Sequence, residues 1–459
     1  MNIQFLLLCL QVGIATSENI KRSLDPSDIG IVILSQSYPY HSEHAKLLKN
    51  DIIRQAELME KDPPNVIFTH ELKIPGSWTF SPLLPYLSSN YSNSKWFIFC
   101  LENTAIRLPE LIKVLSKYNP KKNLWISHAL TDQEYTIRHH FASTKNFLKY
   151  PNHASGFAIT KKILHELLTK ATNFEVDFSI DPSYEFALAV WDEGKGQNLT
   201  HSSEFCIVSS LECATYPKPF HPCGEAVPNK NIYVGVKTCK KFKDDRLSVI
   251  LKTWTRYAVN IGFYTDEADE NLANSYLVPK TDKGHCAKTY EILKHAYTVM
   301  KEKKIDWLLI ADDDTILSLS RIQKLLSCYN PKDLIALGER YGFRINSDGY
   351  NYITAGGGLV LSAPLVELII NSKVCKCPYP DIPDDMFLFG DCLKLLQVEI
   401  IHSPSFHQAR PDDYTPGYLA SHEAVSFHSF WNIDPEELYK IWFSEDDRQF
   451  FESQTHTEL

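Results

Sequence analysis

The sequence predicts an α/β protein that contains two copies of one domain in tandem. Residues 96–121 and 307–332 align without a gap, and 10 of these 26 positions are identical, where chance gives roughly one or two. In both segments an apolar run typical of a buried strand is followed by a short polar break and by apolar residues at helical spacing. Each segment ends on Tyr-Asn-Pro-Lys. This self-similarity favours duplication of one strand and helix unit.

The beginning of each copy follows the same order of elements. The first copy opens with the apolar strand Ile29–Leu34, and a helical pattern follows around Ala45–Met59. The second copy opens with Asn231–Val236 and continues into the helical stretch Arg246–Tyr257. Continuous apolar runs of this length are typical of strands that are buried on both faces.

The boundaries follow from these elements. We place the first domain at 28–210 and the second at 231–450. The segment between them, 211–230, is rich in Pro and Cys and lacks periodicity, which is typical of a linker. Downstream, the segment Ala154-Ser-Gly of the first copy echoes Ala355-Gly-Gly-Gly of the second.

The two ends of the chain predict a compartment. Residues 1–17 resemble a cleaved signal peptide, because Phe5–Ala15 is apolar but too short to span a bilayer, and Ala15 and Ser17 suit a signal peptidase. A buried N-terminal strand is the alternative. The last four residues, 456–459, read His-Thr-Glu-Leu, one residue away from a retrieval signal of the endoplasmic reticulum. Together they predict a soluble protein of the endoplasmic reticulum lumen that a retrieval receptor binds.

Composition and charge exclude several classes of partner. The chain is 44% hydrophobic with a net charge of −9, which is typical of a globular protein. No Lys/Arg cluster is long enough to follow a phosphate backbone, so nucleic acid is not expected as a partner. No stretch of 18 or more apolar residues occurs, so no membrane-spanning segment is expected.

The cysteines agree with an oxidising compartment. The chain has 11 cysteines, and removal of Cys9 with the signal peptide leaves an even number that we expect mostly to pair. Cys375 and Cys377 are too close to pair with each other, and no second half of a zinc motif is present. The sequons at Asn90 and Asn198 are compatible with glycosylation in the lumen.

An acidic cluster distinguishes the two copies. Asp312, Asp313 and Asp314 follow the strand Ile305–Ala311, whereas Leu101–Asn103 stand at the aligned positions of the first copy. Carboxylates at the carboxyl end of a strand repel one another unless a divalent cation relieves the repulsion. An Asp-x-Asp there suits Mn²⁺ or Mg²⁺ that bridges the diphosphate of a nucleotide sugar. A solvated acidic turn is the alternative.

Two further motifs of the second copy are candidates for the site. Gly356, Gly357 and Gly358 permit a close approach between backbone and ligand, although an ordinary loop is the alternative. Neither a P-loop nor a dinucleotide-binding motif is present. Asp384 and Asp385 precede an apolar segment with helical character. One of the two carboxylates is a candidate general base towards a sugar hydroxyl, and capping of the helix is the alternative role.

Two histidines could complete a metal site that begins at Asp314. His407 and His428 each follow an aromatic residue late in the chain. Imidazole is a common ligand of transition metals. A structural hydrogen bond is the alternative for each of them, and the residues alone do not choose between the two.

Taken in order, these motifs resemble the inverting β-1,3-glycosyltransferases related to fringe. The resemblance covers residues 230–445, about half of the chain, and only the ordered series is specific to that family. Its quoted motifs are Val-Lys237-Thr238, Arg246-Leu, Thr-Asp266, Asp312-Asp-Asp314, Gly356-Gly-Gly358 and Asp384-Asp385.

The resemblance implies a fold and a reaction. It implies two tandem GT-A-like (Rossmann-like) nucleotide-sugar transferase domains, of which the N-terminal one is degenerate and not catalytic. Within the family, the tail of the chain is similar to the branch of β-1,3-glucosyltransferases that extend O-linked fucose on thrombospondin type 1 repeats. That branch implies UDP-glucose as donor, Mn²⁺ as cofactor and fucosylated repeat glycoproteins as acceptors. The role of the first domain stays open between recognition of the folded acceptor repeat and support of the second domain.

The resemblance also assigns residues. The second carboxylate of the Asp384–Asp385 pair is the base. The metal ligands are Asp312, Asp314 and His428, with His407 as the alternative to His428. The nucleotide-sugar site comprises Lys237, Thr238, Arg246, Asp266, Asp312, Asp313, Gly356, Gly357 and Gly358.

Two other functions stay open from the residues alone. The first is transfer of galactose or N-acetylglucosamine by another fringe-like β-1,3-glycosyltransferase, because no residue distinguishes these sugars from glucose. The second is a catalytically silent, lectin-like quality-control protein of the endoplasmic reticulum.

Overall fold

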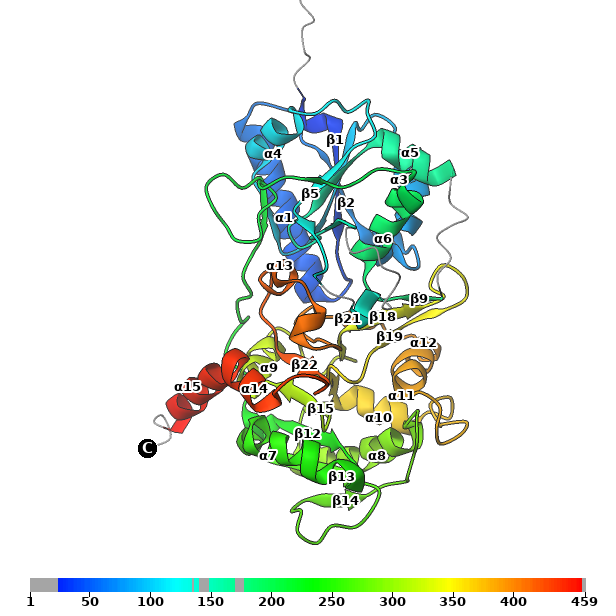
Figure 1. The fold of residues 1–459 in the computed structure, drawn as a ribbon, viewed down its shortest axis with the longest axis vertical. Coiled ribbons are helices and arrows are strands. Elements are labelled where there is room, and N and C mark those ends of the chain that lie inside the picture. The colour runs from blue at the N-terminus through cyan, green and yellow to red at the C-terminus, as the bar shows by residue number, and fades with distance from the viewer. Residues whose placement is uncertain (1–23, 134–135, 140–147, 170–176, 456–459) are drawn as a thin grey trace, which may run out of the picture.

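The computed structural model describes residues 24–133, 136–139, 148–169 and 177–455. The predicted signal peptide 1–17 and the retrieval signal 456–459 lie outside the described residues. Figure 1 shows two sheets with their helices, one above the other along the long axis of the molecule. The prediction of an α/β fold is confirmed, since both sheets are mixed and Rossmann-like.

The N-terminal sheet has the strand order β10-β5-β8-β3-β1-β2. All neighbouring strands are parallel except β8, which runs antiparallel to β3 and β5. Its strands are β1 (Ile29–Leu34), β2 (Asn65–Phe68), β3 (Trp96–Leu101), β5 (Trp125–Ser127), β8 (Phe157–Thr160) and β10 (Thr200–His201). The helices beside it are α1 (Pro39–Leu58), α2 (Thr69–Leu72), α3 (Leu84–Asn90), α4 (Leu108–Leu115), α5 (Lys161–Thr169) and α6 (Pro182–Trp191).

The C-terminal sheet has the strand order β14-β13-β12-β15-β20-β17-β21. Its strands are β12 (Ile232–Lys237), β13 (Asn260–Thr265), β14 (Ser275–Leu277), β15 (Trp307–Asp312), β17 (Ala336–Gly338), β20 (Leu359–Ser362) and β21 (Ile401–His402). Its helices are α7 (Ser248–Lys252), α8 (Cys286–Lys303), α9 (Leu319–Leu326), α10 (Ala363–Asn371), α11 (Asp384–Met386), α12 (Cys392–Leu395), α13 (Pro416–Leu419), α14 (Pro435–Trp442) and α15 (Ser444–Thr455).

The two sheets share one topology. From β2 to β10 and from β13 to β21, the order of corresponding strands and the parallel or antiparallel sense of each pair are the same. Each half adds a short antiparallel pair, which begins after β3 in the N-terminal half and after β15 in the C-terminal half. In the N-terminal half this pair is β4 (Thr104–Ile106) with β11 (Thr215–Pro217), and in the C-terminal half it is β16 (Thr315–Leu317) with β22 (Ser426–His428). Strand β11 lies inside the predicted linker.

The central strands are buried because helices cover both faces of each sheet. All six residues of β1 and of β12 are buried, and the first five residues of β15 are buried as well. Trp96 and Trp307, at the equivalent first positions of β3 and β15, are both fully buried. The sequence similarity between the two halves therefore reflects residues that pack in equivalent positions of the two cores. The polar residues at the ends of the strands do not pack in the cores and can differ between the halves.

Several elements join the two halves. Strand β9 (Phe178–Ser179) of the N-terminal half pairs with β18 (Arg340–Phe343), which pairs in turn with β19 (Tyr350–Ile353). Helix α13 reaches up to the N-terminal half, where the Asn152 side-chain amide donates to the Gly417 carbonyl at 3.0 Å. A two-stranded pair, β6 (Ala129–Leu130) with β7 (Tyr150–Pro151), lies nearby in the N-terminal half.

The described residues form four disulfides, which confirms that the cysteines mostly pair. The pairs are Cys206–Cys213, Cys223–Cys328, Cys286–Cys377 and Cys375–Cys392. Cys375 and Cys377 have different partners, as predicted. Among the described cysteines, Cys100 and Cys239 are free.

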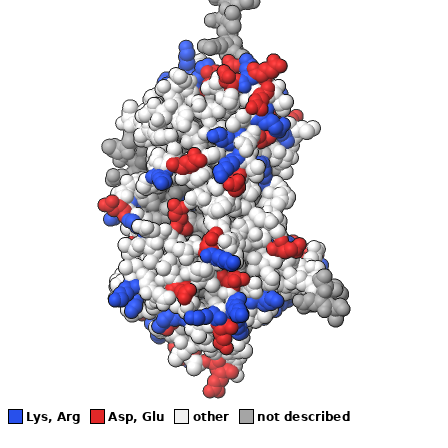
Figure 2. Space-filling view, turned by 180° about the vertical axis from the view of Figure 1, so that it is seen from behind, with Lys and Arg blue, Asp and Glu red and all other residues white. Residues whose placement is uncertain are grey.

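Charged residues of both signs and the two sequons lie on the surface. On the face in Figure 2, basic and acidic side chains are interspersed and do not separate into large patches of one sign. Asn90 and Asn198, the residues of the two sequons, are both exposed. No helix in the described part of the chain is both long enough and apolar enough to cross a bilayer.

Candidate functional site

The acidic cluster lies where strand β15 of the C-terminal sheet ends. Asp312 is the last residue of β15, and Asp313 and Asp314 form the turn into β16. Asp313 and Asp314 are buried, whereas Asp312 is partly exposed. A carboxylate at this edge faces the crevice where open α/β sheets bind their ligands.

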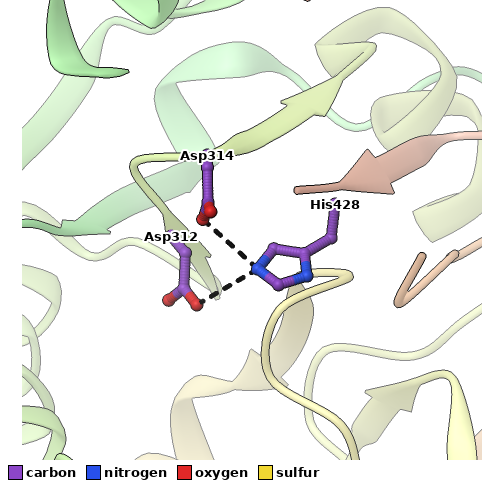
Figure 3. A group of neighbouring side chains, drawn as sticks. All are labelled: Asp312, Asp314 and His428. Carbon is purple, nitrogen blue, oxygen red and sulfur yellow. Dashed lines mark ion pairs between the residues drawn. The ribbon is translucent and has the colours of Figure 1, made fainter. Parts of the chain in front are cut away.

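Strand pairing brings His428 to this turn. His428 lies opposite Thr315 in the β16–β22 pair. Its Nε2 lies 3.2 Å from Asp314 Oδ1 and 3.9 Å from Asp312 Oδ2, as Figure 3 shows. Although burial opposes the charge of the imidazole, the hydrogen bond and charge of Asp314 raise the pKa of His428 above its usual value.

These three side chains suit a divalent metal. One potential ligand atom from each of Asp312, Asp314 and His428 lies within 4.8 Å of the others. Two carboxylates and one imidazole form a donor set that first-row divalent metals accept. The His428 Nδ1 lies 3.0 Å from the Gln408 carbonyl, and a hydrogen bond there would leave Nε2 free as the ligand atom.

His407, the alternative to His428, does not belong to this cluster. It is fully buried, its Nδ1 lies 2.9 Å from the Ser426 carbonyl, and its Nε2 lies 2.9 Å from His422 Nε2. Burial and the neighbouring His422 lower the pKa of His407 well below its usual value. The burial and the contacts of His407 therefore favour a structural role for this residue.

Arg246 lies beside the acidic cluster. It comes from the π-helical segment Lys243–Leu247, and its guanidinium lies 2.7 Å from Asp314 and 3.3 Å from Asp313. Burial opposes the charge of Asp314, but His428 and Arg246 together lower the pKa of that carboxyl below its usual value. Arg246 is thus a positive charge close to the candidate metal ligands.

Lys237 connects the acidic cluster to the candidate base pair. This buried residue ends β12, and its Nζ lies 3.1 Å from Asp312 and 2.8 Å from Asp384. Thr289 donates a further hydrogen bond to Asp384 at 2.5 Å. Burial opposes the charge of Asp384, but Lys237 lowers the pKa of that carboxyl below its usual value. Asp384 is consequently a buried carboxylate whose Oδ2 contacts both Lys237 and Thr289.

Asp385 differs from Asp384. It stays partly exposed at the start of α11, and the Met386 N–H donates to its Oδ1 at 2.7 Å. Burial and the charge of Asp384 raise the pKa of Asp385 to about 6. A carboxylate with a raised pKa is a stronger base, so the geometry favours Asp385 as the proton acceptor.

The remaining predicted residues surround the same sheet edge. Thr238 donates to Asp313 at 2.7 Å, and burial raises the pKa of Asp313 to about 7. Asp266 follows β13 and accepts from the Lys240 N–H at 3.0 Å. Both residues therefore lie on loops at the carboxyl ends of neighbouring parallel strands.

Glycine is favoured at each of the three positions for a different structural reason. Gly358 has a φ of +82°, which favours glycine. A Cβ at Gly356 would lie 2.7 Å from both His428 and Gln408, and a Cβ at Gly357 would lie 3.0 Å from the His407 backbone. The glycine segment therefore lets His428 and Gln408 approach the backbone closely.

Three polar residues of this site were not predicted from the sequence. Lys288 and Thr289 lie on the buried face of α8, and Lys288 donates to the Thr238 carbonyl at 2.7 Å. Gln408 accepts from the Gly357 N–H at 3.0 Å. The available signal was a Lys and a Thr at core positions of an amphipathic helix, where unpaired polar residues are rare.

Comparison with known proteins gives the family. The sequence model described as Fringe-like matches residues 227–452. The chain is 42% identical to a human β-1,3-glucosyltransferase over 93% of this chain and 87% of that protein. It is also 42% identical to a mouse β-1,3-glucosyltransferase, over 95% and 90% of the two chains. A Drosophila melanogaster fringe glycosyltransferase is 33% identical over 46% of this chain and 51% of its own. The chain therefore belongs to the β-1,3-glucosyltransferases of the fringe-like family.

Proposed function

We propose that this protein transfers glucose from UDP-glucose, in β-1,3 linkage, to O-linked fucose on thrombospondin type 1 repeats. The observation that carries this proposal is the Asp312, Asp314 and His428 cluster beside the partly exposed Asp385, at one sheet edge of a β-1,3-glucosyltransferase homologue. The endoplasmic reticulum lumen is the proposed compartment, supported by the four disulfides and by the terminal segments of the sequence.

The donor would bind at the carboxyl edge of the C-terminal sheet. Asp312, Asp314 and His428 would hold Mn²⁺, which when bound supplies positive charge to the leaving diphosphate. Arg246 lies close enough to these ligands to place a second positive charge at the same side of the site. Asp266 and Thr238, at the ends of neighbouring strands, line the rest of the donor edge.

Asp385 would carry out the proton transfer. Its carboxylate removes the proton of the fucose 3-hydroxyl while that oxygen forms a bond to the anomeric carbon of glucose. The bond from the anomeric carbon to the diphosphate oxygen breaks, and UDP leaves with the electron pair. Attack on the face opposite UDP inverts the configuration of the anomeric carbon.

Asp384 and Lys237 would position this base. Lys237 and Thr289 both bind Asp384 Oδ2, and these two contacts would fix the first turn of α11. A fixed helix start places the neighbouring Asp385 in one orientation, and orientation is a large component of catalysis.

The experiment is a donor panel with a defined acceptor. Purified full chain is incubated with Mn²⁺, a fucosylated thrombospondin type 1 repeat, and UDP-glucose, UDP-galactose or UDP-N-acetylglucosamine. We expect transfer from UDP-glucose at least about tenfold faster than from the other donors, since pocket contacts to a sugar hydroxyl discriminate by that much or more.

Two results would contradict the proposal. Preferred transfer of galactose or N-acetylglucosamine would leave a fringe-like transferase with a different donor. Absence of both transfer and hydrolysis of every UDP-sugar, in protein with an unchanged thermal melting curve, would favour the silent lectin-like protein.

A further inference from the structure

A large cleft separates the two halves of the molecule, away from the acidic cluster. Its volume is about 1490 Å³, whereas small-molecule sites are typically about 300–1,000 Å³. On the N-terminal side its lining includes Ser35, His70 and Glu102, which follow β1, β2 and β3 at the carboxyl edge of the sheet. On the C-terminal side it includes Arg340 of β18 and Tyr350 of β19. The cleft therefore has room for more than one small ligand.

Arg340 is a cation in this cleft without a matching anion. Its Nε is buried and donates to no acceptor among the described residues. Its guanidinium stacks on Trp78, 4.4 Å from the ring centroid, and the Trp78 Nε1–H donates to Asn351 at 3.0 Å. Burial lowers the pKa of Arg340 to about 9. A buried N–H donor without an acceptor is costly, so a partner for the Arg340 Nε is expected.

One nearby carboxylate, that of Glu102, already has a partner. Glu102 pairs with His41, with the carboxylate oxygen 2.5 Å from Nδ1. Arginines elsewhere in the interface have their own partners: Arg138 pairs with Asp181 at 3.2 Å, and the exposed Arg344 pairs with Asp177 at 2.8 Å. Among these three arginines, Arg340 alone lacks an ion pair within the described residues, and its planar fork suits a carboxylate.

The wall of the cleft contacts the helical segment that follows the proposed catalytic base. Strand β18, which begins with Arg340, pairs with β19, which begins with Tyr350. Tyr350 lines the cleft, and a Cβ at Gly390 would lie 2.7 Å from its ring. Gly390 belongs to the helical segment that follows Asp385. One small sheet therefore forms a wall of the cleft and also contacts the helix that carries the base.

We propose that the cleft holds a segment of the acceptor polypeptide, with the carboxylate of an acidic side chain paired to Arg340. This inference rests on the proposed function, in which the acceptor is a folded, fucosylated polypeptide. A nucleotide is less suited to this edge, because Leu101, Asn103 and Pro217 replace the acidic and imidazole groups that would hold its metal. The fucose would enter the catalytic site while its polypeptide extends along β18 and β19.

The test compares two acceptors, a fucosylated thrombospondin type 1 repeat and a simple aryl α-fucoside without polypeptide. In Arg340→Gln we expect KM for the repeat to rise roughly 30-fold, the usual effect of removing one partner of a buried charge pair. The kcat for the repeat, both constants for the fucoside and the affinity for UDP should stay unchanged. Arg344→Gln, a matched exposed arginine in the same hairpin, should change neither acceptor.

The contrary outcomes are distinct. Equal losses with both acceptors, no loss with either, or weaker UDP binding in Arg340→Gln would each overturn the cleft proposal. If that variant does not fold, Arg340→Lys keeps the charge but loses the fork, and the same selective rise in KM is required of it. Failure of wild-type protein to glucosylate either acceptor would instead contradict the proposed function.

Discussion

The carboxyl edges of the two sheets have the same backbone arrangement but carry different side chains. Leu101 ends β3 in the N-terminal half and a turn through Asn103 follows, whereas Asp312 ends β15 in the C-terminal half and a turn through Asp314 follows. The short strand pairs show the same replacement, since Pro217 lies opposite Thr104 where His428 lies opposite Thr315. Each of the three candidate metal ligands thus has a counterpart that cannot bind a metal through a charged or imidazole group.

The hydrogen bonds behind these side chains are the same in both halves. The Thr104 hydroxyl donates to the Ala154 carbonyl at 2.9 Å, and the Thr315 hydroxyl donates to the Gly356 carbonyl at 2.7 Å. Gly156 has a φ of +81°, close to the +82° of Gly358. The same backbone scaffold can therefore stand with or without metal-binding side chains, which is why fold alone does not indicate activity.

The largest expected effect is loss of the base, which only the C-terminal half provides in our proposal. Asp385→Asn keeps the size of the side chain but cannot accept the proton. We expect kcat/KM to fall by roughly 10²- to 10⁴-fold, with unchanged Mn²⁺ affinity and an unchanged thermal melting curve. A variant that retains wild-type kcat would remove Asp385 from the mechanism.

The second prediction exchanges one residue between the two edges. Asp314→Asn gives the C-terminal edge the residue of Asn103, and we expect activity to fall on the order of 10³-fold, since metal charge supplies several kcal/mol. Asn103→Asp is the matched control and should leave activity within about twofold. Mn²⁺ titration by electron paramagnetic resonance should show weaker binding only in Asp314→Asn, and equal loss in both variants would contradict the assignment.

The third prediction concerns the glycine that has an alanine counterpart. Ala154 stands where Gly356 stands, and its Cβ is tolerated because Pro217 replaces His428. In Gly356→Ala the new Cβ would displace His428, so we expect Mn²⁺ affinity to fall roughly 10- to 100-fold. The reverse change, Ala154→Gly, should alter neither Mn²⁺ affinity nor activity. Unchanged affinity in Gly356→Ala would mean that His428 does not bind the metal.

The sequence predicted the parts of this site whose residues are contiguous in the chain. It did not predict the parts that depend on residues remote from one another in sequence. The repeated strand and the acidic turn Asp312–Asp314 are contiguous, so pattern and charge were sufficient to predict them. The choice between His428 and His407 depended on which segment pairs with β16, and no local pattern records that pairing. The distinct environments of Asp384 and Asp385 likewise depended on Lys237 and Thr289, which are remote in sequence. The disulfide pairs could not be predicted either, because most of them join cysteines that are remote in sequence.

The smallest expected effect concerns the dependence of kcat/KM on pH. The acidic side of this profile tests Asp385 as the base. Asp385 accepts a proton only when it is ionised, and its pKa is raised to about 6 by burial and by Asp384. We therefore expect kcat/KM to be level above about pH 7 and to fall about tenfold per unit below pH 6. Asp313→Asn should keep this acidic limb, which would exclude Asp313 as its source.

A second ionisation in the pH profile, near pH 8, would indicate that the N-terminal half also affects transfer. Burial raises the pKa of Glu185, in the N-terminal half, to about 8, and no part of the proposed chemistry uses this residue. A limb near pH 8 that disappears in Glu185→Gln would show that ionisation in the N-terminal half affects transfer. An unchanged profile in Glu185→Gln is our expectation, because the proton transfer involves groups of the C-terminal sheet edge alone.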